Sequence, residues 1–255
     1  MPALGMLGST KKPRSSSTSR SPLSRVVCRH RDDVAISSRS NSQRLNHFAV
    51  ARVEQFSDGV IAIAITIIVL GIAVPLAGSD GLLTKLLDLW PSYLAYVISF
   101  LTIGGFWFNH HTIFFCLRAI NSSVMRVNLL LLMAIAFLPF PTAVMAQDLA
   151  QSGPGGEVAV VFYGLSLLLC RLLLTWLWSV CTKDHLIRPE IDRADLTRLT
   201  RRLNPGFLLY TAAIIVGVFI PEVGPWLYLL IAIYTVVTTR SVDFDDSKEL
   251  AGGVG

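Results

Sequence analysis

The sequence predicts an all-α membrane protein with six transmembrane helices. Hydrophobic residues make up 53% of the 255 residues and charged residues only 15%, and the mean hydropathy is +0.58. Such a composition is typical of helices surrounded by lipid. Two further observations support this class: several apolar runs are long enough to cross a bilayer, and basic residues alternate between the connections that join them.

The chain begins with a polar segment, residues 1–47, that is rich in Ser and Arg. Its acidic residues are Asp32 and Asp33, and it has no apolar core of the kind that a secretory signal peptide requires. We predict a disordered basic tail, or a start placed upstream of the true one. A mitochondrial or chloroplast transit peptide has the same composition and is the alternative.

A transmembrane helix needs about 20 apolar residues, because about 30 Å of hydrocarbon is crossed at 1.5 Å per residue. Four runs meet this length and two shorter runs follow, which gives spans near residues 58–76, 91–115, 127–147, 158–181, 205–221 and 224–239. Because the last two are separated only by a turn-like Pro-Glu-Val-Gly, we expect a tight helical hairpin. A re-entrant pair that does not span is the alternative. The membrane domain is then 48–240, and residues 241–255 form a second disordered tail.

The first span follows Ser57 and Asp58, and residues 59–75 carry no charge. Either side chain is a favourable N-cap, since it can accept from the free N–H groups of the first helical turn. Within the span, one apolar stripe follows the spacing i, i+3, i+4 and i+7. The stripe consists of Ile63, Thr66, Ile67 and Leu70. In most transmembrane helices such a stripe serves packing.

The basic residues predict the orientation, because Lys and Arg are retained on the cytoplasmic side. The segment before the first span is strongly basic, and the first, third and fifth connections hold Lys85 and no Arg. The remaining basic residues lie in the even connections and after the last span: Arg118, Arg126, Lys183, Arg188, Arg193, Arg198, Arg201, Arg202 and Arg240. This alternation predicts a multi-pass protein of the cell membrane with both termini in the cytoplasm.

A polar motif just before the first apolar run resembles a known family. The motif is Arg52-x-x-x-Phe56-Ser57-Asp58, and the later features that agree with it are Trp107, His110, His111, Asn128 and the Leu-Pro-Phe at 138–140. Together they are similar to the transmembrane protein 175 family of potassium channels, in the form with one six-helix unit per chain. The resemblance covers about residues 48–240.

The resemblance implies a K⁺ channel whose first helices surround the pore, without a carbonyl-lined filter. The constriction residues implied by position are Ile63, Ile67 and Leu70, with Thr66 as a neighbouring polar ring. Apolar constrictions can gate a pore by dewetting. A single six-helix unit implies a homotetramer in the lipid bilayer, with K⁺ as the permeant ion and no cofactor.

The polar motif would anchor and orient this helix, because a buried charge must be paired and hydrogen-bonded. We predict a structural network that joins the first helix to the next two. Its members are Arg52, Phe56, Ser57, Asp58, Trp107, His110, His111 and Asn128. The alternative is that the two histidines simply lie at the membrane interface, where amphipathic rings are common.

Other activities have little support in the sequence. The cysteines at 28, 116, 170 and 181 lack metal-site spacing, and adjacent His110 and His111 point to different sides of a helix. We find no enzyme motif and expect no metal site. The net charge of +5 is explained by the positive-inside pattern and the tail, so nucleic acid is not an expected partner.

Two functional alternatives stay open at this point. A proton-coupled secondary transporter would use Asp58, the histidines and Arg171, which lies near the middle of the fourth span. For Arg171 we expect a pairing between helices or subunits before a role in an ion path. The second alternative is a membrane scaffold without transport activity.

Overall fold

The computed structural model describes residues 49–74, 81–151, 156–191, 196–197, 200–201 and 205–238, which all lie in one compact unit, Leu45–Gly255. The predicted tails, residues 1–47 and 241–255, lie outside the described residues. The first helix covers residues 49–67 and continues into η1 (Ile68–Gly71); it is followed by α2 (Leu82–Asp88), α3 (Trp90–Phe115), α4 (Ser122–Phe137), α5 (Pro139–Gln151), α6 (Gly156–Lys183), α8 (Pro205–Phe219), η2 (Pro221–Val223) and α9 (Gly224–Thr238). Apart from an isolated bridge between Leu117 and Ile187, the described secondary structure is helical, which confirms the predicted class.

Five of the described helical segments are long and apolar enough to cross a membrane. They are Ala49–Gly71, Trp90–Phe115, Ser122–Ala150, Gly156–Lys183 and Pro221–Thr238. The predicted fifth span corresponds to the shorter apolar helix Gly206–Phe219. The structure therefore shows a multi-pass helical protein, while the sixth crossing stays a prediction.

The expectation that Ser57 or Asp58 caps the first helix is wrong. Residues 49–67 form continuous helix, so Ser57 and Asp58 both lie inside it. The Ser57 hydroxyl donates to the carbonyl oxygen of Val53 at 2.8 Å, a bond that a serine inside a helix can form with its preceding turn. Residues 49–56 include no Gly or Pro, so nothing in them opposes helix formation.

The predicted third span, 127–147, lies within the single candidate span Ser122–Ala150, which is interrupted at Leu138 between α4 and α5. The side chain of Asn121 accepts from the backbone N–H of Val124 at 2.9 Å and so caps the start of α4. At the other end, α4 stops at Phe137 and α5 begins at Pro139. Proline has no N–H to donate, which explains why the helix breaks at this point.

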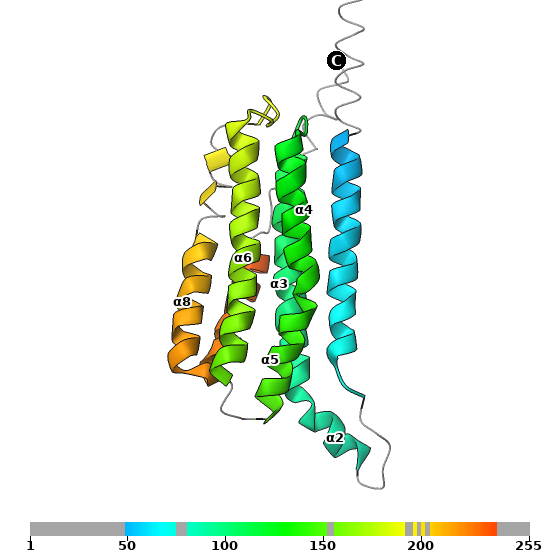
Figure 1. Ribbon diagram of the computed structural model, residues 1–255, viewed down its shortest axis with the longest axis vertical. Coiled ribbons are helices and arrows are strands. Elements are labelled where there is room, and N and C mark those ends of the chain that lie inside the picture. Colours follow the sequence, from blue (N-terminus) through cyan, green and yellow to red (C-terminus); the bar gives the residue numbers. More distant parts are fainter. Residues whose placement is uncertain are drawn as a thin grey trace, which may run out of the picture. The chain divides into compact units, whose positions relative to one another are not determined.

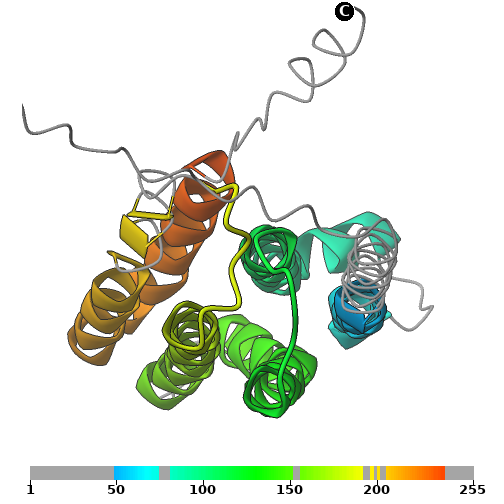
Figure 2. The same cartoon turned by 90° about the horizontal axis from the view of Figure 1, so that it is seen from above.

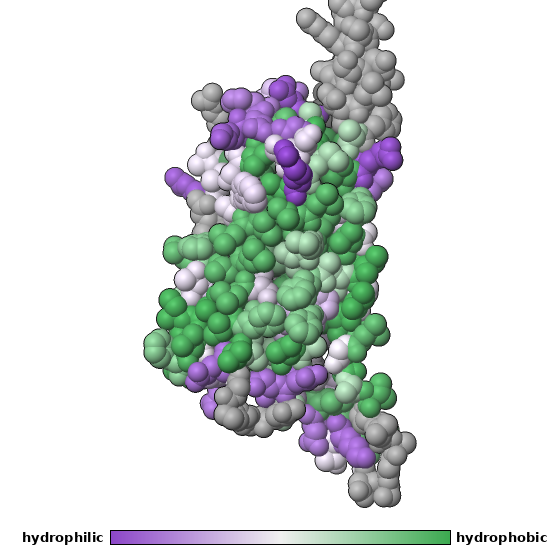
Figure 3. Space-filling model, in the orientation of Figure 1, coloured by the Kyte–Doolittle hydropathy of each residue, from purple (hydrophilic) through white to green (hydrophobic). Residues whose placement is uncertain are grey.

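The helices pack side by side, as Figure 1 shows. The first helix and the pair formed by α8 and α9 lie at opposite sides, with α3, α4 and α6 between them (Figure 2). The contacts agree, because η1 packs on α3 and α5, whereas α8 packs mainly on α6 and α9. Apolar residues cover the middle of the visible surface and hydrophilic residues gather at its two ends (Figure 3).

A buried polar cluster joins three of the central helices. The hydroxyl of Ser99 on α3 lies 2.8 Å from the hydroxyl of Thr142 on α5 and 2.9 Å from that of Tyr163 on α6. All three side chains are buried. Hydrogen bonds between helices are a common means of holding membrane helices together. The central helices thus offer a fixed support against which the first helix can pack.

Gly164 allows α6 to approach α8 and α9 closely. A Cβ atom at this position would lie 2.6 Å from Cγ1 of Ile214 and 2.9 Å from Cζ of Tyr228. The Tyr228 hydroxyl also donates to the carbonyl oxygen of Val160 at 3.1 Å, so its ring cannot move without loss of that bond. Overpacking of this kind typically costs about 1–3 kcal/mol.

We therefore expect Gly164→Ala to lower the thermal unfolding midpoint of the purified protein. Gly104→Ala is the matched control, because a Cβ atom there meets nothing within 4 Å. Intrinsic fluorescence during heating in detergent would measure both midpoints. Equal midpoints for the two variants would show that α6 does not need glycine at position 164.

Candidate functional site

The first helix leaves one apolar face uncovered. Ile63 is 60% exposed, Ile67 44% and Leu70 78%. Together with the exposed Thr66 these residues form a surface that we call the Ile63 stripe. On the opposite face Ile61, Ala64 and Ile68 are buried against the rest of the chain. The helix is therefore held by one apolar face, while a second, equally apolar face is left uncovered by the described residues.

Thr66 is the polar member of the Ile63 stripe. Its hydroxyl donates to backbone carbonyl oxygens of its own helix, those of Ala62 at 3.0 Å and Ile63 at 2.9 Å. The proton is thus directed toward the helix, and the lone pairs of the hydroxyl oxygen remain available on the exposed side. Such an oxygen can accept a hydrogen bond or face a cation.

A fully buried hydrogen-bonded chain joins this helix, at Ser57, to α3 and α4. The side-chain nitrogen of Asn128 donates to the Ser57 hydroxyl at 2.9 Å, and its side-chain oxygen lies 2.9 Å from Nε2 of His110. Because the amide oxygen can only accept, Nε2 of His110 carries a proton in this arrangement. The His110 ring also stacks on Phe114, with a centroid distance of 4.3 Å.

A second set of contacts lies beside this chain and is partly exposed. Nε1 of Trp107 donates to Oδ1 of Asp58 at 2.9 Å. The Trp107 ring stacks on His111, and Nδ1 of His111 lies 2.9 Å from Oε1 of Glu54. The first helix and α3 are thereby joined at two successive turns, since Glu54 and Asp58 are one turn apart on the same helix.

Six of the eight residues predicted to form a network are thus brought together: Ser57, Asp58, Trp107, His110, His111 and Asn128. The other two, Arg52 and Phe56, are exposed on the first helix, and Arg52 forms no hydrogen bond or ion pair with the described residues. The sequence analysis missed Glu54. Its position four residues before Asp58 could have indicated it, because this spacing places both carboxylates on one helix face.

Arg171 lies in the contact between α6 and α8. Its side chain is buried, and a Cβ atom at Gly206 would lie 2.6 Å from its Cζ. This position agrees with a role between helices and is not on the first helix.

These features define a multi-pass helical membrane protein. Its first helix is fixed by buried hydrogen bonds on one face and bare on another. Comparisons with known proteins identify the family more closely.

A family model described as the endosomal/lysosomal potassium channel TMEM175 matches residues 52–139. The chain is 45% identical over 162 residues to a potassium channel of Streptomyces collinus, a match that covers 62% of this chain and 78% of the relative. A potassium channel of Chamaesiphon minutus is 40% identical over 169 residues, which cover 64% of this chain and 82% of the relative.

The crystal structure of a lysosomal potassium-selective channel TMEM175 homolog from Chamaesiphon minutus is similar with a TM-score of 0.69. The sequences are 34% identical in this comparison, which covers 76% of this chain and 99% of that chain. The chain belongs to the TMEM175 family. The resemblance inferred from the motif around Ser57 and Asp58 is therefore confirmed.

Proposed function

We propose that the chain is a subunit of a potassium channel that conducts K⁺ passively across a membrane. The observation that carries this proposal is the uncovered Ile63 stripe on a helix whose other face is fixed by buried contacts. The names of the relatives from Streptomyces and Chamaesiphon support K⁺ as the permeant ion. The family is one of ion channels, so the protein is not expected to be an enzyme or to need a cofactor.

In the proposed assembly, four copies surround one axis and each contributes its first helix to the pore. The stripe residues then form stacked rings, with Ile63, Ile67 and Leu70 as apolar constrictions and Thr66 as a polar ring. Burial in such an assembly accounts for a face that the single subunit leaves bare. Apolar rings of this kind can close a pore by excluding water.

The hydrogen-bonded contacts of the first helix have a positioning role in this proposal. The radius of a pore depends on the position of each helix that lines it. The contacts of Ser57 and Asp58 fix the first helix against α3 and α4. Each such bond contributes about 0.5–1.5 kcal/mol net. Several together hold the Ile63 stripe in one orientation toward the axis.

The proposed placement is the cell membrane, with six crossings and both termini in the cytoplasm. Exposed basic residues at one end of the described helices, Arg118, Arg126 and Lys183, support this orientation through the positive-inside rule. The driving force is then the electrochemical gradient, about 2.3 kcal/mol per charge per 100 mV.

Ion flux from proteoliposomes tests the proposal directly. Purified full-length protein is reconstituted with an outward K⁺ gradient or an outward Na⁺ gradient, and flux is measured with a voltage-sensitive dye. We expect rapid flux that is faster for K⁺ and needs no proton gradient. Saturable flux that depends on a proton gradient would identify a secondary transporter, and absence of flux above protein-free vesicles would favour a scaffold.

A further inference from the structure

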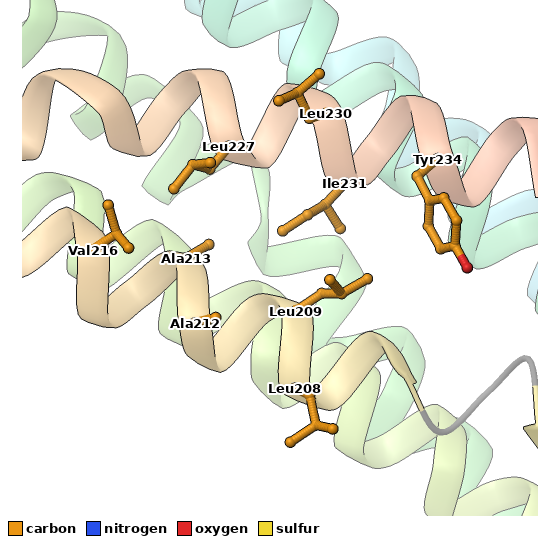
Figure 4. Close-up of a pocket in the computed structure, with 9 residues that line it drawn as sticks. All are labelled: Leu208, Leu209, Ala212, Ala213, Val216, Leu227, Leu230, Ile231 and Tyr234. Carbon is orange, nitrogen blue, oxygen red and sulfur yellow. The ribbon is translucent and has the colours of Figure 1, made fainter.

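A second apolar feature lies away from the proposed pore, between α8 and α9. The two antiparallel helices enclose a groove of about 680 Å³ (Figure 4). Its lining is aliphatic except for Tyr234 near one end. Ala213 and Ile231 are buried at its base, whereas Leu208 and Leu230 at its margins are largely exposed. The groove is therefore open to the surroundings of the subunit.

Small side chains create this groove. Ala213 stands opposite the larger Leu227 and Ile231, and Ala212 also lines the groove, so the two helices do not fill the space between them (Figure 4). From Leu208 to Val216 the groove extends about 12 Å at 1.5 Å per residue. This length is close to the roughly 15 Å of hydrocarbon in one leaflet of a bilayer.

The location of the groove argues for lipid as its occupant. The α8–α9 pair lies on the opposite side of the subunit from the first helix (Figure 2). If first helices meet at the axis, as the proposed function requires, this side faces outward. Water does not fill an apolar surface at this depth, and the available apolar molecules are lipid chains.

An exposed basic residue precedes α8 in the chain. The segment before α8 is tied to α6 by a hydrogen bond from Nε1 of Trp178 to the Thr200 hydroxyl, at 2.9 Å. The next residue, Arg201, is exposed. α8 begins at Pro205, so Arg201 precedes in sequence the end of α8 that carries Leu208. A guanidinium at the end of an apolar groove is complementary to an anionic headgroup above an acyl chain.

We infer that the groove between α8 and α9 binds an acyl chain of an anionic phospholipid, with the phosphate held near Arg201. This inference rests on the proposed function only for the outward direction of the groove. It assigns a lipid site to a surface that takes no part in conduction.

Native mass spectrometry of the intact, full-length protein tests this inference. Delipidated protein is mixed with phosphatidylglycerol or phosphatidylcholine, and bound lipid per subunit is counted. We expect phosphatidylglycerol to bind more tightly. Ala212→Phe fills the groove and should weaken its binding about tenfold. Ile215→Phe places the same ring on an exposed position of α8 outside the groove, and should bind as wild type does.

The charge is tested separately with Arg201→Gln. This variant should bind the two lipids about equally, while Arg126→Gln, an exposed cation on α4, should keep the preference for phosphatidylglycerol. Equal binding by Ala212→Phe and Ile215→Phe would overturn the inference. The inference would also be overturned if wild type bound no lipid and Ala212→Phe formed a smaller assembly. That result would identify the groove as a contact between copies of the chain.

Potassium flux measured on the same preparations separates this inference from the proposed function. Flux without lipid at the groove would remove the lipid site and leave the channel intact. Lipid bound in the groove of a protein that shows no flux would support the lipid site and contradict the proposed channel.

Discussion

Replacement of Asn128 by leucine is expected to lower the free energy of unfolding by about 1–3 kcal/mol. The asparagine side chain joins Ser57 on the first helix to His110 on α3, and all three residues are buried. Leucine has a similar size but no polar atoms, so the Nε2 proton of His110 loses its acceptor. A buried donor without a partner costs about this much. Side-chain bonds between membrane helices usually give values toward the lower end.

Thermal unfolding in detergent, followed by the amount of protein that remains assembled after heating, measures this effect. Leu129→Ala is the control, because Leu129 is the adjacent residue on α4 and is exposed. The double variant Ser57→Ala, Asn128→Leu adds a stricter test. Because the two side chains share a hydrogen bond, the double variant should lose less stability than the two single variants lose in sum. Additive losses would show that Ser57 and Asn128 do not stabilise each other.

Much of the helical architecture could be predicted because a bilayer imposes a minimum length on each apolar run. The residues at which each helix begins and ends were harder to predict, as Ser57 illustrates. Serine and aspartate favour helix starts, but inside a helix serine can also bond to the preceding turn, as Ser57 does with Val53. Local sequence does not distinguish these two uses. Pro139 is a helix breaker that can be recognised in the sequence. The continuous apolar run around it nevertheless led to the prediction of one uninterrupted span.

The uncovered face of the first helix depends on tertiary structure. Ile61, Ala64 and Ile68 are as apolar as Ile63 and Ile67, so periodicity alone does not show which face is buried. The family resemblance implied that the face with Ile63 and Ile67 is directed toward the pore. The structure adds a physical reason, because the contacts of the adjacent polar turn orient the helix.

Contacts between distant residues were likewise beyond local sequence reasoning. Asp58 and Trp107 are 49 residues apart, and Ser57 and Asn128 are separated by 71. The set of residues followed from the resemblance, but the individual pairs required the packing of three helices. Glu54 and His111 were overlooked as a pair for the same reason.

If the Ile63 stripe lines the pore, Ile63→Asn should increase total flux about tenfold and reduce the preference for K⁺ over Na⁺. An amide at an apolar constriction can hydrogen-bond water, so water and hydrated ions enter more readily. A decrease of 1.4 kcal/mol in the barrier corresponds to tenfold in rate. Thr66→Ala should change flux less, because it leaves the apolar constrictions at Ile63, Ile67 and Leu70 in place. Flux from proteoliposomes with K⁺ or Na⁺ gradients measures both variants.

Val69→Asn distinguishes a pore effect from a general effect of polarity on the first helix. Val69 is also exposed, but its position on the helix lies outside the Ile63 stripe. Wild-type selectivity in Val69→Asn, together with altered selectivity in Ile63→Asn, would identify the face that the ions meet. The same change in both variants would indicate a loosened assembly. Unchanged flux in Ile63→Asn would contradict the proposed pore, because an ion path narrowed at this residue must respond to a polar side chain there.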